Sequence, residues 1–299
     1  MAQYNNVHLY ALACSDARAD RDSGTGDIVN ASVFAYTISS ARRYEGANEG
    51  NKIELNQILI RSGVPEMAAK IAEIRLHDIF ILKGTLNTRN VPKYVTCPQC
   101  SLKYNAVSGT TSDDALGMTT FVTPIDLDIR DRSFGDRTRE IKNMDCTKDE
   151  ITKMLLDERN KAFQMLLEHR EMSNEVQVIG NLCADPEQYE NGWATAYQVG
   201  INRNFYLRDD SPSSFSDYPF IRSYGRQADS DMEHLQKGTL VLVDGFLRIR
   251  TFDRITKCPE CGTEKQWESR VLEIVPYSVQ YLDGVRHKDM DRETERSGH

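Results

Sequence analysis

The 299-residue sequence contains no run of about eighteen consecutive apolar residues, the length that a membrane-spanning helix needs. Its first six residues, Met1 to Asn6, lack the charged and then apolar pattern of a secretory signal. Four catalytic signatures are also missing, namely the Walker loop, Gly-x-Gly-x-x-Gly, His-Glu-x-x-His and Gly-x-Ser-x-Gly. The sequence therefore predicts a cytoplasmic protein that has no membrane contact and is not an enzyme.

The cysteine and basic residue content argues against a disulfide-stabilised protein and against a protein whose whole surface is basic. The seven cysteines are odd in number and include two Cys-x-x-Cys pairs, which favours a reducing compartment over a disulfide framework. The 37 Lys and Arg residues against 45 Asp and Glu residues give a net charge of −8, so the surface is not coated in basic charge. A local basic stripe can still bind phosphates on an otherwise acidic protein.

An internal repeat divides the chain. Residues 80–100 and 241–261 align without a gap at a constant offset of 161 residues (245 − 84). The matched positions are Gly84 with Gly245, Leu86 with Leu247, Cys97 with Cys258, and Cys100 with Cys261. A glycine, a leucine and a Cys-Pro-x-Cys pair in one register predict a duplicated domain.

Both copies are dominated by strand patterns. Tyr197, Val199 and Ile201 alternate as one inward face, and every odd position from residue 241 to 251 is small or apolar. Gly245 in the middle of that strand predicts a sharp bend, as at the corner of a small barrel. Short helices are expected after Pro65 and near residues 229–232. Strands, one helix and two more strands follow the element order of a five-stranded OB-fold barrel.

A helical segment separates the two copies. Thr147 and Glu150 form a capping-box pattern, and apolar residues follow near one helical face. The chain is therefore predicted to be mainly β, with two tandem five-stranded OB-fold barrels, a helical linker, and Cys-Pro-x-Cys turns inserted between strands 4 and 5. The predicted parts are a diverged OB-fold domain at 1–145, the linker at 146–172, a second OB-fold domain at 173–283, and a disordered tail at 284–299.

One strand of the second copy carries a pattern suited to unpaired nucleotides. Phe246, Arg248, Arg250 and Phe252 share one face of the predicted strand. Aromatic rings can stack on bases of any sequence, and guanidinium groups can bind phosphates. The stretch from residue 245 to 257 has four basic residues, including Arg254, and one acidic residue, for a net charge of +3 (4 − 1). The alternative is a solvated strand whose large side chains only cover the barrel.

The corresponding stretch of the first copy is weaker. It carries Arg89 and Lys93 and no acidic residue, but it has no aromatic residue before Tyr94. We expect a weaker or purely electrostatic contact there. Other aromatic residues are candidates that periodicity does not separate from the core, namely Trp193, Phe205, Tyr206, Tyr218, Phe220, Tyr224 and Trp267.

Several runs in the second copy resemble the bacterial single-stranded DNA-binding protein family in order and spacing. The runs are VIGNL (178–182), DPE (185–187), VGINR (199–203), FIRSYGRQA (220–228), LQKGTLVLVDG (235–245) and SVQYL (278–282). The resemblance covers about residues 174–282. It implies an OB barrel that binds single-stranded DNA without sequence preference, in replication, recombination, repair or transfer, and that catalyses no reaction.

The resemblance also assigns roles to single residues. Tyr224 lies where the family usually has a tryptophan near the end of the third strand, and Arg203 falls at the base of the hairpin between the second and third strands. Arg248 and Arg250 lie on the fourth strand and face the DNA. Arg226, in the same run as Tyr224, completes the candidate contacts.

The resemblance bears on assembly and partners as well. The first copy resembles the diverged second barrel of family members with two barrels per chain, which pair as dimers, so it implies a homodimer here. Family members often end in an acidic tail that docks replication or recombination proteins. This tail balances four acidic with four basic residues after Val285 and ends in Ser297-Gly298-His299, which puts that docking role in doubt.

The two Cys-Pro-x-Cys turns resemble zinc knuckles. Each pair, Cys97 with Cys100 and Cys258 with Cys261, supplies two thiolates, whereas a structural zinc site needs four ligands. The turns could meet within one chain or across a dimer to complete a tetrahedral site. Alternatively, each pair is a relic that ends a hairpin without metal.

The sequence thus predicts a non-enzymatic single-stranded DNA-binding protein, with structural zinc as a possible cofactor. Two alternatives stay open at this point. One is a protein-interaction adapter whose acidic barrels no longer bind nucleic acid. The other is a zinc-containing accessory subunit of a replication or repair complex.

Overall fold

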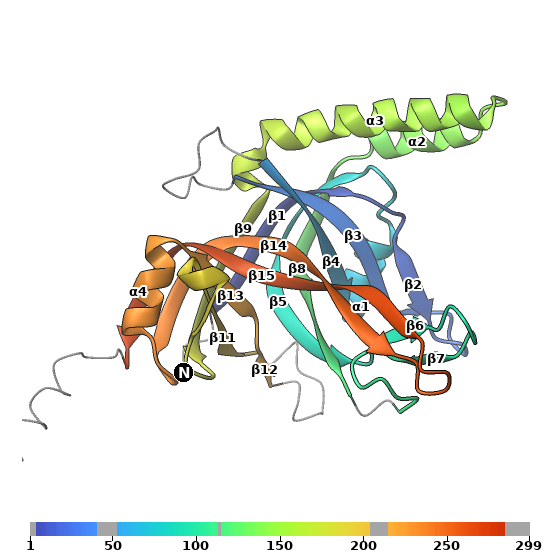
Figure 1. The fold of residues 1–299 in the computed structure, drawn as a ribbon. Coiled ribbons are helices and arrows are strands. Elements are labelled where there is room, and N and C mark those ends of the chain that lie inside the picture. The colour runs from blue at the N-terminus through green and yellow to red at the C-terminus, as the bar shows by residue number, and fades with distance from the viewer. Residues whose placement is uncertain (1–3, 41–52, 113–114, 204–214, 285–299) are drawn as a thin grey trace, which may run out of the picture.

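The computed structural model describes residues 4–40, 53–112, 115–203 and 215–284 (Figure 1). The N-terminal half comprises β1 (Tyr4–Ala13), β2 (Arg18–Arg21), β3 (Ile28–Ser40), β4 (Ile53–Ser62), α1 (Pro65–Ala72), β5 (Ile79–Val91), β6 (Tyr94–Thr96), β7 (Lys103–Asn105) and β8 (Gly117–Asp131). Between the halves lie α2 (Ser133–Lys142), α3 (Lys148–Glu168) and the short helix η1 (Arg170–Met172). The C-terminal half comprises β9 (Asn174–Leu182), β10 (Glu187–Tyr189), η2 (Glu190–Gly192), β11 (Ala194–Asn202), β12 (Ser216–Asp217), β13 (Phe220–Tyr224), α4 (Arg226–His234), β14 (Leu240–Lys257) and β15 (Glu264–Asp283).

The strands of each half pair in a closed circuit. In the N-terminal half the circuit runs β1–β3–β4–β8–β5 and back to β1, and in the C-terminal half it runs β9–β11–β13–β15–β14 and back to β9. The pairs β4–β8 and β13–β15 are parallel, and the other pairs of the two circuits are antiparallel. The fold is therefore mainly β and consistent with the OB type, as the sequence predicts.

Gly84 and Gly245 bend the longest strands. The register shifts at Lys83/Gly84 on β5 and at Asp244/Gly245 on β14. A Cβ atom would lie 2.4 Å from the Thr123 carbonyl oxygen at Gly84 and 2.2 Å from the Val275 carbonyl oxygen at Gly245, so only glycine fits at either bend. The bend predicted at Gly245 is confirmed.

The two halves are joined edge to edge by β1 and β9, which pair antiparallel from Tyr4↔Ile179 to Leu9↔Asn174. One apolar core runs through both halves. The Asn5 side chain donates a hydrogen bond to the Leu86 carbonyl oxygen (2.8 Å) and accepts one from the Leu86 amide (2.9 Å). The Asn174 side chain forms the same two hydrogen bonds with Leu247, at the same distances. The halves are thus related by an approximate twofold axis that passes near the β1–β9 pair.

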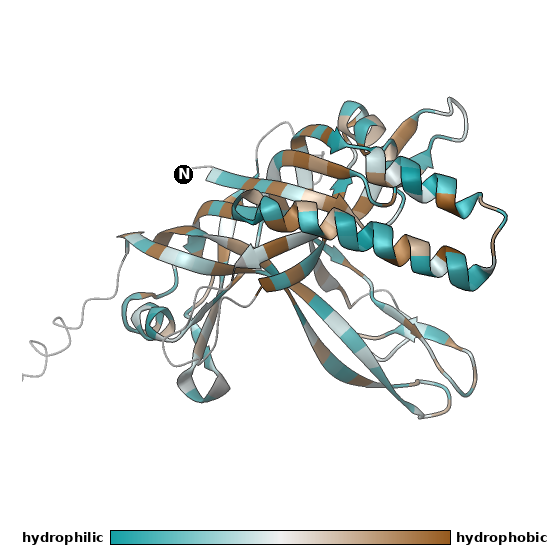
Figure 2. Ribbon diagram, turned by 90° about the horizontal axis from the view of Figure 1, so that it is seen from above, coloured by the Kyte–Doolittle hydropathy of each residue, from teal (hydrophilic) through white to brown (hydrophobic). Residues whose placement is uncertain are grey.

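Helices α2 and α3 form an antiparallel hairpin on one side of the strands (Figure 1). The predicted capping box is confirmed, because the Thr147 amide donates to Glu150 Oε2 at 3.0 Å and the Glu150 amide donates to Thr147 Oγ1 at 3.4 Å. Only Glu158, Ala162 and Leu166 of α3 are buried, and much of the hairpin is hydrophilic (Figure 2). No helix within the described residues is long and apolar enough to cross a bilayer.

Candidate nucleic-acid interface

The outer face of the C-terminal half carries the charged cluster that defines the candidate interface. Along β13, β15 and β14, Ile221, Ile274 and Leu247 point into the core, so the alternate positions face outward. The outward set is Arg222, Glu273 and Arg248. In OB folds the outer face that includes strands 2 and 3, which are β11 and β13 here, is the face used for oligonucleotides.

Three guanidinium groups surround the single carboxylate of Glu273. Its oxygens lie 3.3 Å from Arg222 Nε, 2.7 Å from Arg248 Nη2 and 3.1 Å from Arg250 Nε, and the residue is 2% exposed. Burial lowers the pKa of Arg248, but its hydrogen bond to Glu273 and the negative charge there outweigh this effect and raise the pKa above the usual value. The four side chains together carry a formal charge of +2 (3 − 1), and Arg250, whose side chain is 35% exposed, is the most accessible of the three cations.

Aromatic rings lie against these guanidinium groups. The ring centroid of Tyr189 is 4.8 Å from Arg222 Cζ, that of Tyr224 is 4.7 Å from Arg248 Cζ, and that of Phe252 is 4.9 Å from Arg250 Cζ. Arg248 also donates a hydrogen bond to the Tyr224 hydroxyl, whose pKa is raised mainly by burial. Rings and cations therefore alternate across this face, an arrangement that can bind bases and phosphates side by side.

Phe246 requires a correction. It is 3% exposed and packs against Tyr277, with ring centroids 5.3 Å apart. The ladder from Phe246 to Arg250 is regular, so Phe246 does share the face of Arg248, but the bulge at Asp244/Gly245 adds Tyr277 to β15 and the Tyr277 ring packs against Phe246. Phe246 offers no ring to a base, and we leave it out of the candidate interface.

Arg203 lies just after β11, at the expected base of the hairpin, but its guanidinium group is held in an ion pair. Its guanidinium donates to both carboxylate oxygens of Asp217, at 2.9 and 2.6 Å, and the side chain is only 13% exposed. Asp217 in turn accepts hydrogen bonds from the Thr88 amide (2.6 Å) and from Asn87 (3.0 Å) in the N-terminal half. Arg203 therefore helps to hold the two halves together, and we do not count it among the DNA contacts.

The remaining predicted residues occupy varied positions. Arg226 is exposed at the start of α4, and Arg254 is exposed with its guanidinium over the Phe252 ring at 4.9 Å. Arg89 is exposed near the end of β5. Lys93 is half-buried and donates to the Thr119 hydroxyl, and burial lowers its pKa. Arg89 and Lys93 belong to the N-terminal half and contact none of the cluster residues.

The structure sorts the aromatic residues that periodicity left undecided. Trp193, Tyr218 and Phe220 are exposed and Trp267 is half-buried, whereas Phe205 and Tyr206 lie outside the described residues. Three contributors were missed: Tyr189, Arg222 and Glu273. Alternation of Phe220, Arg222 and Tyr224 on β13 could have identified Arg222. Glu273 gave no signal, because it stands within an apolar run.

The N-terminal half does not repeat the charged cluster. By strand register, Arg61 corresponds to Arg222, but Phe121 stands in the place of Glu273 and Asn87 in the place of Arg248. Phe34, 44% exposed, pairs with Leu59 on the same outer face. This face is more apolar and less charged than its counterpart.

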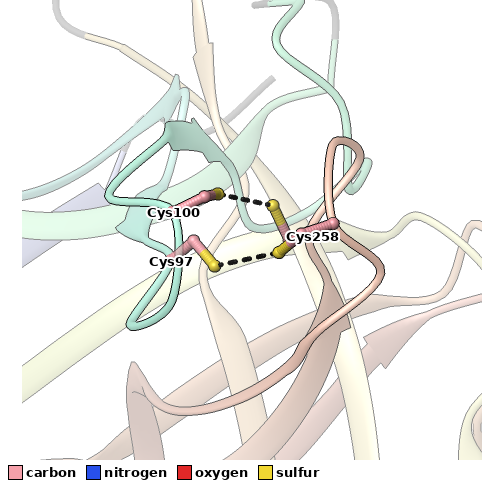
Figure 3. A group of neighbouring side chains, drawn as sticks. Cys97, Cys100 and Cys258 are labelled. Atoms are coloured by element: carbon pink, nitrogen blue, oxygen red, sulfur yellow. Dashed lines mark hydrogen bonds between the residues drawn. The ribbon is translucent and has the colours of Figure 1, made fainter.

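The four knuckle cysteines meet at one point within the chain, which is one of the arrangements that the sequence left open. Figure 3 labels three of them, Cys97, Cys100 and Cys258, whose side chains point toward one another. Cys97 Sγ lies 3.5 Å from Cys261 Sγ, Cys100 Sγ lies 3.6 Å from Cys258 Sγ, and all four sulfurs lie within 4.8 Å of one another. In a tetrahedral zinc site with Zn–S bonds of about 2.3 Å, the sulfurs are about 3.8 Å apart. The four thiols are therefore compatible with a tetrahedral metal site.

The thiols also differ in acidity. Hydrogen bonds to the side chain and backbone of Thr263 lower the pKa of Cys261 to about 6. At Cys100 a hydrogen bond with the backbone of Leu102 lowers the pKa, but burial and the neighbouring thiols outweigh it and raise the pKa to about 12. A thiolate at neutral pH is the form that binds a metal, so Cys261 is prepared to be the first ligand.

Comparison with known proteins places the chain in a family. The sequence pattern of the "Single-strand binding protein family" matches residues 173–267. Single-stranded DNA-binding protein 3 of Clostridium acetobutylicum is 31% identical over 114 residues, which are 37% of this chain and 71% of that protein. The chain belongs to the single-strand binding protein family. Single-stranded DNA-binding protein A of Bacillus subtilis is 33% identical over 117 residues, 38% of this chain and 60% of that protein.

Solved structures agree on the fold. A deletion mutant of the single-stranded DNA binding protein from Thermus aquaticus has a TM-score of 0.52 and 13% identity, with 97% of this chain and all of that chain covered. The family resemblance drawn from the sequence is confirmed by the family match and by the relative in Clostridium acetobutylicum. Proteins of the single-strand binding protein family bind single-stranded DNA and are not enzymes, so those two predictions are confirmed as well.

Proposed function

We propose that this family member binds single-stranded DNA through the outer face of its C-terminal half, without sequence preference. The phosphates would bind the guanidinium groups of Arg248 and Arg250, while the buried Arg222 holds the Glu273 carboxylate. The bases would stack on exposed rings such as those of Tyr189 and Trp193. The observation that supports this assignment is the excess of two positive charges around Glu273, set between aromatic rings. Nothing in such a site requires one particular base.

Further contacts would extend along the β14–β15 ribbon. Phe252 lies between the groups of Arg250 and Arg254, beyond the closed part of the strand circuit. We include Tyr224, Arg226 and Arg254 in the proposed interface, with Arg89 and Lys93 as weaker electrostatic contacts of the N-terminal half.

Fluorescence anisotropy with labelled oligo-dT of several lengths, at salt concentrations from 50 to 500 mM, tests this proposal. We expect tight binding that weakens linearly on a plot of log affinity against log salt, and weak binding to duplex DNA of the same length. Binding that is independent of salt, or a preference for duplex, would contradict it.

We propose that the two strand circuits are tandem OB barrels that arose by duplication, with a domain at 1–145, a helical linker at 146–172, a second domain at 173–283 and a tail at 284–299. Support comes from the 161-residue repeat and from the equivalent roles of Asn5 and Asn174. Of the tail, only Gly284 lies within the described residues.

We further propose a cytoplasmic homodimer that acts in replication, recombination or repair. Light scattering should then give about twice the chain mass of 34.1 kDa.

We also propose that the four knuckle cysteines bind one structural zinc ion. Four sulfur donors at near-tetrahedral spacing support this assignment. Cys14, Cys146 and Cys183 are single thiols and would take no part. Elemental analysis of the purified protein is the direct test, with one zinc per chain expected.

A further inference from the structure

The two cysteine turns are the ends of two arms, one from each half. The arm of the C-terminal half is the β14–β15 ribbon, and the arm of the N-terminal half is the end of β5 with the β6–β7 hairpin (Figure 1). The turns have the same backbone geometry. The Ser101 amide donates to the Cys97 carbonyl oxygen at 3.1 Å, and the Gly262 amide donates to that of Cys258 at 3.0 Å.

The cysteines pair across the approximate twofold axis. Cys97 lies against Cys261 and Cys100 against Cys258, so each turn offers its first thiol to the second thiol of the other. This exchange is the pattern of an isologous contact, in which the same surface is used twice. Each arm therefore supplies half of one site.

Few other contacts hold the turns together. Cys97, Tyr104 and Cys258 form a small buried cluster with Val95 and Leu102 around it. The Thr263 hydroxyl donates to Gln99 Oε1 at 2.5 Å across the contact. A cluster of this size is far smaller than the shared core of the two halves, so a metal ion would supply most of the attachment between the turns.

The β14–β15 ribbon needs such support. β14 pairs with β9 only as far as Gly245, and β15 pairs with β13 only at Glu273 and Ile274, within the described residues. Beyond these points, from Arg250 to Lys257, β14 has β15 as its only strand partner in the described part of the chain. A two-stranded ribbon is marginally stable in water without further packing.

The same arms carry proposed DNA contacts at matched positions. Arg254 stands four residues before Cys258, and Lys93 stands four residues before Cys97. Phe252 and the exposed Arg254 lie on the part of the ribbon where β14 and β15 pair only with each other within the described residues. The position of these contacts relative to the Glu273 cluster therefore depends on what holds the tip of the ribbon.

We propose that zinc bound by the four cysteines clasps the two arms together and thereby holds their DNA contacts in a fixed frame. This inference rests on the proposed function and on the proposed zinc site. Loss of the metal frees the arms, while the halves stay folded and joined by β1–β9 and by the contacts of Asp217. Metal content therefore controls the affinity for single-stranded DNA without controlling the fold.

The experiment compares zinc-loaded protein, protein stripped of metal under reducing conditions, and stripped protein reloaded with zinc. Cobalt in place of zinc reports the four-thiolate site through its absorption spectrum. The variant Cys97→Ser with Cys258→Ser removes one ligand from each arm, and Cys146→Ser, an exposed thiol between α2 and α3, is the matched control. Oligo-dT anisotropy gives the affinity, and circular dichroism gives the strand content.

We expect stripping and the double variant to weaken dT binding about tenfold, the equivalent of one lost stacked base, with reloading restoring the stripped protein. The strand content should stay unchanged, and Cys146→Ser should bind as the wild type does. Bound zinc with equal affinity in loaded and stripped protein would overturn the clasp alone. A metal-free chain whose measured mass is four hydrogen atoms below that of the reduced chain contains two disulfides, and this result would overturn the zinc site. Zinc-loaded protein that fails to bind dT would overturn the proposed function.

Discussion

Removal of two guanidinium groups from the Glu273 cluster is the sharpest test of the proposed interface. The variant Arg248→Ala with Arg250→Ala changes the charge of the cluster from +2 to 0 (1 − 1). Glu273 keeps Arg222 as a partner at 3.3 Å, so the carboxylate is not left buried and alone. The variant should therefore fold, which circular dichroism and thermal unfolding can verify.

The magnitude follows from counterion release. Each phosphate contact on a single strand adds about −0.7 to the slope of log affinity against log salt, so two lost contacts should reduce the slope by about 1.4. If both proteins bind equally at 1 M salt, the variant should bind about 25-fold more weakly at 0.1 M. Anisotropy titrations with oligo-dT at five or six salt concentrations measure both quantities.

A matched control separates local contact from overall charge. Arg137 and Arg139 are exposed on α2, and each forms an ion pair with an acidic residue three positions away on the helix. Arg137→Ala with Arg139→Ala removes the same two charges, and it should leave the slope unchanged. If the cluster variant loses no more slope than this control, Arg248 and Arg250 contact no phosphate and the reasoning fails.

Three further predictions address single features. Phe252→Ala should weaken dT binding by about 1–3 kcal/mol and leave the free energy of unfolding unchanged. Phe246→Ala should instead lower the free energy of unfolding, measured by urea titration, by about 3–5 kcal/mol without a specific loss of dT binding. Asp217→Ala removes the ion-pair partner of the Arg203 guanidinium and should lower the free energy of unfolding by about 3–5 kcal/mol. If the urea midpoint shifts no more than it does for a variant of an exposed residue, the Arg203–Asp217 pair has no structural role. Burial lowers the pKa of His77 below its usual 6.5. Below about pH 6.5 the unfolded chain therefore binds a proton that the folded chain does not, and the free energy of unfolding should fall. In the variant His77→Asn, the free energy of unfolding should depend less on pH between about pH 7 and 5.5.

The outcome at Phe246 shows where strand alternation stops being informative. A period of two correctly places Phe246 on the face of Arg248, but it does not say which neighbouring side chain covers a residue on that face. Gly245 marked the bend in the sequence. The sequence did not reveal that the bulge adds Tyr277 to β15 and sets its ring against Phe246, while Arg250 on the same face stays partly exposed.

Ion pairing was equally hidden. Arg203 and Asp217 are separated by residues of a connecting segment, and their common partner Thr88 lies in the other half of the chain. Glu273 stands among apolar neighbours and becomes meaningful only when β13, β15 and β14 bring three arginines to it. Such contacts depend on strand order, which local pattern does not encode.

The sequence by itself determined that two segments repeat at an offset of 161 residues, that both are β-rich, that a bend occurs at Gly245, and that each segment carries a Cys-Pro-x-Cys turn. These features are local, because they depend on spacing and on backbone sterics within a few residues. The tertiary structure alone decided which carboxylate gathers the arginines, which arginine joins the halves, and that the two turns face each other. Those outcomes arise from the antiparallel pairing of β1 with β9, which sets two distant segments around one approximate twofold axis and brings four sulfurs together.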